Sequence, residues 1–82
     1  MLKDHYLEED YELLTDELDK LHRTCMNVLN DVAEANFENT KIHLQQINKS
    51  MTLLQALNNK KLKRDEFELH NYLLYQRRGW IK

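Results

Sequence analysis

The fold is decided by the stretch from Leu7 to Ala35, which reads LEEDYELLTDELDKLHRTCMNVLNDVAEA. Its apolar residues recur in alternating steps of four and three, which is the spacing of a heptad seam in a coiled coil or helical bundle. The members of this seam are Leu7, Tyr11, Leu14, Leu18, Leu21, Cys25, Val28 and Val32, with Ala35 at the end. At about 1.5 Å per residue the stretch predicts a helix roughly 43 Å long, which is unstable without a packing partner.

The composition of the whole chain also favours helices. Its 82 residues include one glycine and no proline, so we expect an all-α chain that forms one domain over residues 1–82. A chain of this size has a limited core of its own. The single cysteine excludes an internal disulfide framework and favours a reducing, cytoplasmic location. No apolar run is long enough for a signal peptide or a transmembrane span, so we expect no membrane insertion.

Three helices and two interruptions are predicted. The long N-terminal helix covers about 5–35, and a break or bend follows because residues 36–40 combine weak helix formers with possible N-caps. A second helix covers about 38–57, and a turn at 58–64 separates it from a third helix over about 65–78. The apolar stripe of the second helix consists of Leu44, Ile47, Met51, Leu54 and Leu57. The predicted fold is therefore a small helical bundle of two to three helices.

Charge is distributed unevenly along the chain, whose net charge is −2. Residues 1–41 hold eleven acidic and four basic residues, a balance of −7, whereas residues 42–82 hold three acidic and eight basic residues, a balance of +5. This asymmetry predicts contacts between the two halves, or partners that bind each half separately. The positions flanking the seam are acidic without matching bases, which favours a bundle over a parallel zipper of two copies. We expect this bundle to dimerise, with the seam packing either within one chain or between two.

The four histidines and the cysteine raise the question of a metal site or a nucleophile. A carboxylate three residues before His22 has the spacing seen in di-iron bundles, but such a site needs a second pair and further inward glutamates. Cys25 lies in the seam, where we expect a small core residue, and no base lies nearby in the sequence to activate it. We therefore expect the histidines to lie on the surface, and we expect no metal, no cofactor and no enzymatic activity.

The basic residues of the second half suggest an alternative function. They are Lys60, Lys61, Lys63, Arg64, Arg77 and Arg78. With the rings of Tyr72, Tyr75 and Trp80 as stacking surfaces, these cations are typical of a nucleic-acid-associated regulator. However, the chain is acidic overall, and the run from Lys60 to Arg64 is short and is followed at once by acidic residues. A solvated turn whose cations offset a helix dipole is the simpler interpretation, so we do not expect nucleic acid to be the main partner.

The remaining functional signal is the apolar surface of the second half, which exceeds what one thin bundle buries on a single face. Surfaces rich in methionine and aromatic residues suit the binding of partner helices. The residues expected to bind a partner protein are Met51, Leu53, Leu54, Leu57, Phe67, Tyr72, Tyr75 and Trp80. An alternative is that this surface is buried in a homo-oligomer and has no other role. We expect a small non-enzymatic protein-interaction module, acting as a chaperone, adaptor or inhibitory regulator and working as a cytoplasmic homodimer.

Overall fold

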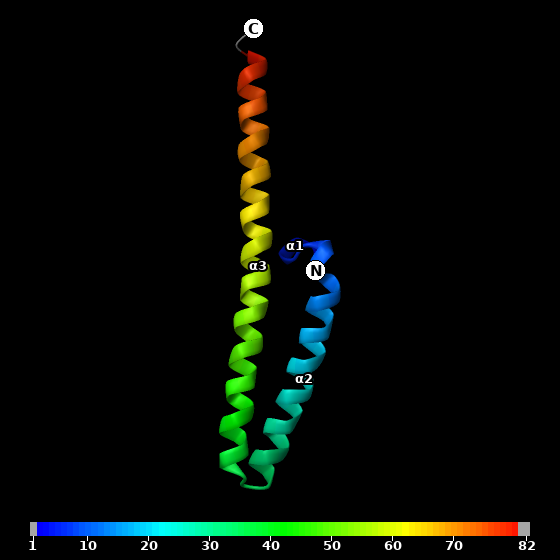
Figure 1. Cartoon of the computed structure of the whole chain (residues 1–82), viewed down its shortest axis with the longest axis vertical. Coiled ribbons are helices and arrows are strands. Elements are labelled where there is room, and N and C mark those ends of the chain that lie inside the picture. Colours follow the sequence, from blue (N-terminus) through cyan, green and yellow to red (C-terminus); the bar gives the residue numbers. More distant parts are fainter. Residues whose placement is uncertain (1, 81–82) are drawn as a thin grey trace.

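The computed structural model describes the backbone of residues 2–80 and the side chains of residues 2–75. Two short elements, α1 (Leu2–His5) and the 3-10 turn η1 (Glu8–Asp10), precede two long helices, α2 (Tyr11–Ala33) and α3 (Phe37–Trp80). No strand occurs among the described residues, so the all-α class and the long N-terminal helix are confirmed for this part of the chain. The helices α2 and α3 lie side by side and antiparallel, and α3 projects well beyond α2 (Figure 1).

The structure divides the predicted seam into two series, each of which repeats every seven residues. The first series is buried or half-buried and consists of Leu7, Leu14, Leu21 and Val28. It shares the inner side of the helix with polar residues three positions further on, which are Asp10, Glu17, Thr24 and Asp31. The second series consists of Tyr11, Leu18, Cys25 and Val32. Tyr11 is half-buried at the edge of the core, but Leu18 and Val32 are 39% and 48% exposed, and Cys25 is exposed too. Cys25 is therefore not part of the core of the single hairpin, and its predicted burial in the seam would require a second copy.

Helix α3 presents the same kind of surface to α2. Its buried and half-buried residues in alternating steps of three and four are Thr40, His43, Ile47, Ser50, Leu54, Leu57 and Lys61. Leu44 and Met51, which the sequence places in one stripe with Ile47 and Leu54, are exposed instead. Compared with the prediction, both helices are rotated about their axes. The position three residues after Leu14 or Ile47 faces the partner helix, and the position four residues after it does not.

Polar contacts at both ends of the hairpin explain this rotation. Near the start of α2, the Lys60 ammonium donates a hydrogen bond to Asp10 Oδ1 at 3.0 Å. Near its end, His43 Nδ1 lies 2.6 Å from Asp31 Oδ2, and both side chains are largely shielded from solvent. Asp10 and Asp31 are the largely buried partners in these contacts, and leaving a buried carboxylate without a hydrogen bond is costly, so both contacts favour this side of α2 facing α3. They bring together residues of the acidic and the basic half, as the charge asymmetry predicts.

The apolar core of the hairpin is small. Leu14, Leu54 and Leu57 form it, with Tyr6, Tyr11 and Leu21 packed around them, and Leu14 alone is completely buried. Three buried leucines contribute on the order of 2 kcal/mol each relative to exposure. This is a modest contribution for a chain that must also order two long helices.

The loop between the long helices lies where the sequence predicts a break. Helix α2 ends in a Schellman motif, in which the Asn36 N–H donates to the Asp31 carbonyl at 2.7 Å and the Ala35 N–H donates to the Val32 carbonyl at 3.0 Å. Asn36 then caps α3, because its side-chain Oδ1 accepts a hydrogen bond from the backbone N–H of Asn39 at 3.3 Å. The reversal is therefore made by specific backbone and side-chain bonds, with no glycine or proline.

The predicted turn at 58–64 is absent, since α3 is continuous from Phe37 to Trp80. Side chains of this segment bind the N-terminal elements instead: Asn58 Nδ2 donates to the His5 carbonyl at 2.8 Å, and the Arg64 guanidinium pairs with Glu9. The lysines and arginine here are good helix formers, and no residue breaks the helix. The interruption lies at the N-terminus instead, where Leu7 is extended (φ −76°, ψ 142°) between α1 and η1.

The molecule is one layer of helices thick. Its principal extents are 72, 18 and 15 Å, and its radius of gyration is 19.7 Å, against about 12 Å for a compact domain of 82 residues. Its accessible surface of 7012 Å² exceeds the roughly 5200 Å² of a compact monomer of this mass. Stable domains usually pack at least two layers of secondary structure around a core, so this hairpin leaves apolar surface uncovered.

Candidate protein-interaction surfaces

One side of the hairpin carries apolar residues that are mostly exposed, with the half-buried Tyr11 and Asn58 at its end nearest the N-terminal segment. This side is formed by the positions four residues after the first buried residue of each heptad. They lie about 90° around the helix from the side that faces the partner helix. Because the helices run antiparallel, their senses of rotation are opposite, and these positions project from the same side of the hairpin. We call this surface the open face, and its positions are Tyr11, Leu18, Cys25, Val32, Phe37, Leu44, Met51 and Asn58. Seven of the eight residues are apolar.

The opposite side of the hairpin is polar by comparison. The equivalent positions there are Leu13, Lys20, Asn27, Glu34, Asn39, Gln46, Leu53 and Lys60, of which two are apolar. The contrast shows that the apolar character of the open face is not a general property of the hairpin surface. Sequence reasoning included Tyr11, Leu18, Cys25 and Val32 in the seam but did not single out Phe37. The signal that would have found the open face is the seven-residue spacing that Phe37 shares with Leu44 and Met51.

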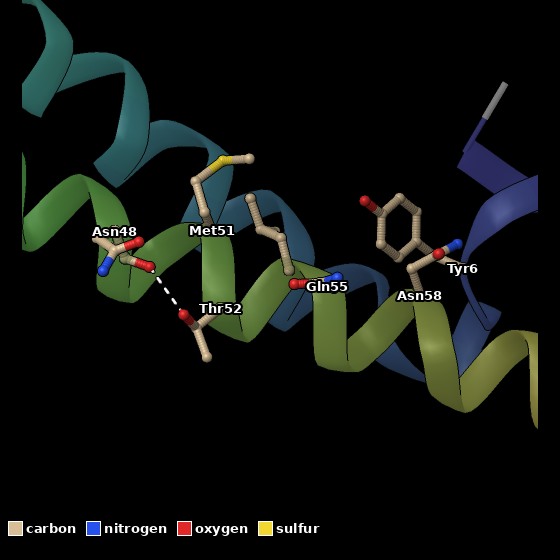
Figure 2. A pocket seen from close by; sticks show the side chains of 7 residues that line it. Tyr6, Asn48, Met51, Thr52, Gln55 and Asn58 are labelled. Carbon is tan, nitrogen blue, oxygen red and sulfur yellow. Dashed lines mark hydrogen bonds between the residues drawn. The ribbon is translucent and has the colours of Figure 1, made fainter.

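A hollow of about 420 Å³ lies where the N-terminal segment meets α3. It is lined by Tyr6, Asn48, Met51, Thr52, Leu54, Gln55 and Asn58. In Figure 2, Tyr6 and Asn58 lie at one end of this hollow, with Met51 and Asn48 towards the other. Its lining residues are amide, hydroxyl and apolar, without a carboxylate, amine or imidazole. Because Tyr6 lines it together with Met51 and Asn58, the hollow lies where the N-terminal segment covers the end of the open face.

The second apolar surface is the part of α3 that extends beyond the rest of the hairpin. We call residues 62–75 the overhang; every one of them is exposed, including Tyr75 at 77%. Its large apolar residues are Leu62, Phe67, Leu69, Tyr72, Leu73, Leu74 and Tyr75. Leu62, Leu69 and Leu73 are spaced by seven and four residues and so form a stripe along one side of the helix. Monomeric proteins rarely expose apolar residues in this concentration unless they bind something.

The residues expected to bind a partner protein fall into three different environments. Leu54 and Leu57 are buried in the hairpin core, so these two are structural residues in this fold, whereas Leu53 is half-buried on the polar side of the hairpin. Met51 belongs to the open face. Phe67, Tyr72 and Tyr75 belong to the overhang, and Trp80 lies outside the described side chains. Only the open face and the overhang remain available to a partner.

Most of the described basic residues considered for nucleic-acid contact are paired with carboxylates. Lys60 binds Asp10, Arg64 binds Glu9, and Lys61 Nζ lies 2.6 Å from Asp65 Oδ1. Lys63 is exposed, and Arg77 and Arg78 lie outside the described side chains. A phosphate backbone would have to compete with these carboxylates for three of the cations, which weakens the electrostatic basis of nucleic-acid binding.

The histidines and the cysteine form no metal site in the part of the chain that the structure describes. Within the described part of the chain, no group of three His, Cys, Asp or Glu residues could hold a metal ion. His5, His22 and His70 are exposed as expected, whereas His43 is half-buried against Asp31 in the hairpin interface. Its imidazole therefore has a structural role, which the sequence did not indicate.

Two further findings concern the chain as a whole. Among the described residues, no helix combines the length and the apolar character needed to cross a bilayer. The sequence matches no protein-family model and no curated protein, and the structure matches no solved one.

Proposed function

We propose that this chain is a small, non-enzymatic protein-interaction module that inserts the overhang of α3 into an apolar groove of a partner protein. The observation that carries this proposal is the exposure of every residue from 62 to 75, half of which are large and apolar. An amphipathic helix that offers apolar residues at i, i+7 and i+11 is a common way of binding such a groove. The chemistry suits a chaperone, an adaptor or an inhibitory regulator.

The stripe of Leu62, Leu69 and Leu73 would be the centre of this contact. Aromatic residues often dominate the binding energy of an interface. Tyr72 flanks the stripe, whereas Phe67 and Tyr75 lie on the opposite side of the helix. The exposed acidic residues of α2, such as Glu12, Asp16 and Asp19, would steer a basic partner toward the module. An exposed free thiol at Cys25 is compatible with the cytoplasmic location that we propose.

A quantitative pulldown with matched variants tests the proposed use of the overhang. The full-length chain, the Leu69→Lys variant and the Asn71→Lys variant are used as baits in extract from the source cell. Both substitutions add one lysine to an exposed position of the overhang. Asn71 lies on the opposite side from the leucine stripe, four residues from both Phe67 and Tyr75, so the two variants distinguish the leucine stripe from the aromatic side. We expect the native and Asn71→Lys baits to retain the same proteins and the Leu69→Lys bait to lose them. Equal retention by all three baits would contradict the proposal.

The nucleic-acid alternative has less support, because Lys60, Lys61 and Arg64 are already paired with carboxylates. A salt titration with duplex DNA and RNA separates the two functions. Binding that falls steeply between about 50 and 200 mM salt, and that weakens on neutralising Lys61 and Arg64, would favour the alternative.

We also propose that the module works as a homodimer. The chain exposes about 1800 Å² more surface than a compact monomer of its mass, and a stable interface buries about 800 Å² or more on each partner. A second copy of a one-layer hairpin would supply the missing layer. Light scattering of the native chain at micromolar concentration is expected to give twice the mass of one chain.

A further inference from the structure

We infer that the open face is the surface through which two copies pair, with α2 of each copy lying beside α3 of the other in a four-helix bundle. This inference rests on the proposed homodimer and adds which surface forms it and in what arrangement. Helices of a bundle bury a broader apolar arc than the two positions per heptad that a two-helix seam uses. The open face is the part of that arc that one hairpin leaves uncovered.

The dimensions of the open face fit a second hairpin. Its residues run from Tyr11 to Val32 on α2 and from Phe37 to Asn58 on α3. Both segments contain 22 residues, counted inclusively from these limits, and so each is about 33 Å long. Two copies therefore cover each other along most of this length. At the far end the N-terminal segment lies against α3, where Asn58 binds the His5 carbonyl, and this limits the face.

The charges of the two helices select the partner and the arrangement. Residues 11–33 hold five acidic and two basic residues, a balance of −3, whereas residues 37–59 hold one acidic and two basic residues, a balance of +1. Lys60 and Lys61 are not counted, because each is paired with a carboxylate of the same chain. The hairpin is therefore self-complementary: each α2 is attracted to an α3 and repelled by another α2. A two-fold axis parallel to the helices places the two α2 helices diagonally and lets each lie between two α3 helices. Both loops then lie at one end of the bundle and both overhangs at the other.

The native cysteine reports on this arrangement directly. Cys25 is exposed in the single hairpin but lies on the open face, so pairing would bury its thiol. Labelling with a maleimide is measured on the full native chain from nanomolar to high micromolar concentration, together with the mass by light scattering. We expect the thiol to react at least about tenfold more slowly where the chain is dimeric, because only the dissociated fraction is accessible. The control is the Cys25→Ser, Asn27→Cys chain, whose thiol is on the polar side and should react rapidly at every concentration.

Two lysine substitutions on α3, on opposite sides of the hairpin, complete the test. Leu44→Lys changes an exposed residue of the open face and is expected to give a monomer, while Gln46→Lys on the polar side is expected to remain a dimer. If the Leu44→Lys chain fails to fold, the protection of the Cys25 thiol in the native chain still tests whether the open face is the dimer interface. A native chain that is monomeric at all concentrations would overturn both the proposed homodimer and this inference. A dimer with a fully reactive Cys25, or one that Leu69→Lys disrupts and Leu44→Lys does not, would leave the homodimer standing and overturn the open face as its interface.

Discussion

At Ala35 the backbone has a φ of 58°, the left-handed conformation that ends α2. A residue with a β-carbon pays about 1–2 kcal/mol for this conformation, and glycine does not. We predict that Ala35→Gly raises the free energy of unfolding by about 0.5–1 kcal/mol, because the added freedom of the unfolded chain offsets part of the gain. Urea denaturation measures the difference. Ala33→Gly, inside the helix, is the control and should lower stability by about 1 kcal/mol; a loss of stability in both variants would contradict the Schellman geometry.

Leu13 and Leu14 are adjacent leucines in opposite environments. Leu14 is completely buried against α3, whereas Leu13 is 47% exposed on the polar side of the hairpin. Leu14→Ala should destabilise the chain by about 2–5 kcal/mol, because it removes apolar contacts and leaves a cavity. Leu13→Ala should change stability by less than about 1 kcal/mol. Equal losses in thermal unfolding experiments would show that α2 faces α3 with a different side.

At the scale of the element, heptad spacing predicted the existence and the length of α2 and its need for a partner, but not which side it buries. That choice depends on contacts between distant residues: Lys60 and Asp10 are 50 positions apart and His43 and Asp31 are 12 apart. Local periodicity contains no information on such pairs. The same holds for residues 58–64, where asparagines and lysines resemble a turn but bind the N-terminal elements from within a continuous helix.

For the candidate surfaces too, the sequence predicts the chemical character of the residues but not which of them are exposed. The apolar and aromatic character of the overhang follows from the sequence, but its exposure does not, because it arises from the difference in length between α2 and α3. Likewise, the sequence shows that the second series of the seam is apolar but not that it lies on the open face. Sequence thus identifies which residues need to be covered, and tertiary structure decides which of them the chain covers itself.

Helix α3 should differ in stability along its length. Residues 47–57 pack against α2 and include the buried Leu54 and Leu57, whereas residues 66–75 are all exposed. Isolated helices of this length are marginal in water, so we predict that amide hydrogens in residues 66–75 exchange orders of magnitude faster than those in residues 47–57. Hydrogen exchange with mass spectrometry makes this comparison within one helix. Equal protection of both segments in the chain alone would show that the overhang is already packed against another copy.

At the scale of the whole molecule, the arrangement of the dimer can be read from its length. One chain extends 72 Å along its longest axis, and residues 62–80 of α3 account for about 28 Å of it. If α2 of each copy lies beside α3 of the other, both overhangs leave the same end, so the dimer keeps a length of about 72 Å and only thickens. If instead the two α2 helices lie side by side and antiparallel, the overhangs leave opposite ends and the length grows to about 100 Å. We predict that small-angle X-ray scattering of the native dimer gives the shorter value, since the charges of α2 and α3 oppose the second arrangement. The Leu44→Lys chain measured in parallel provides the length of the monomer, and a dimer about 28 Å longer than this reference would contradict the charge-based pairing.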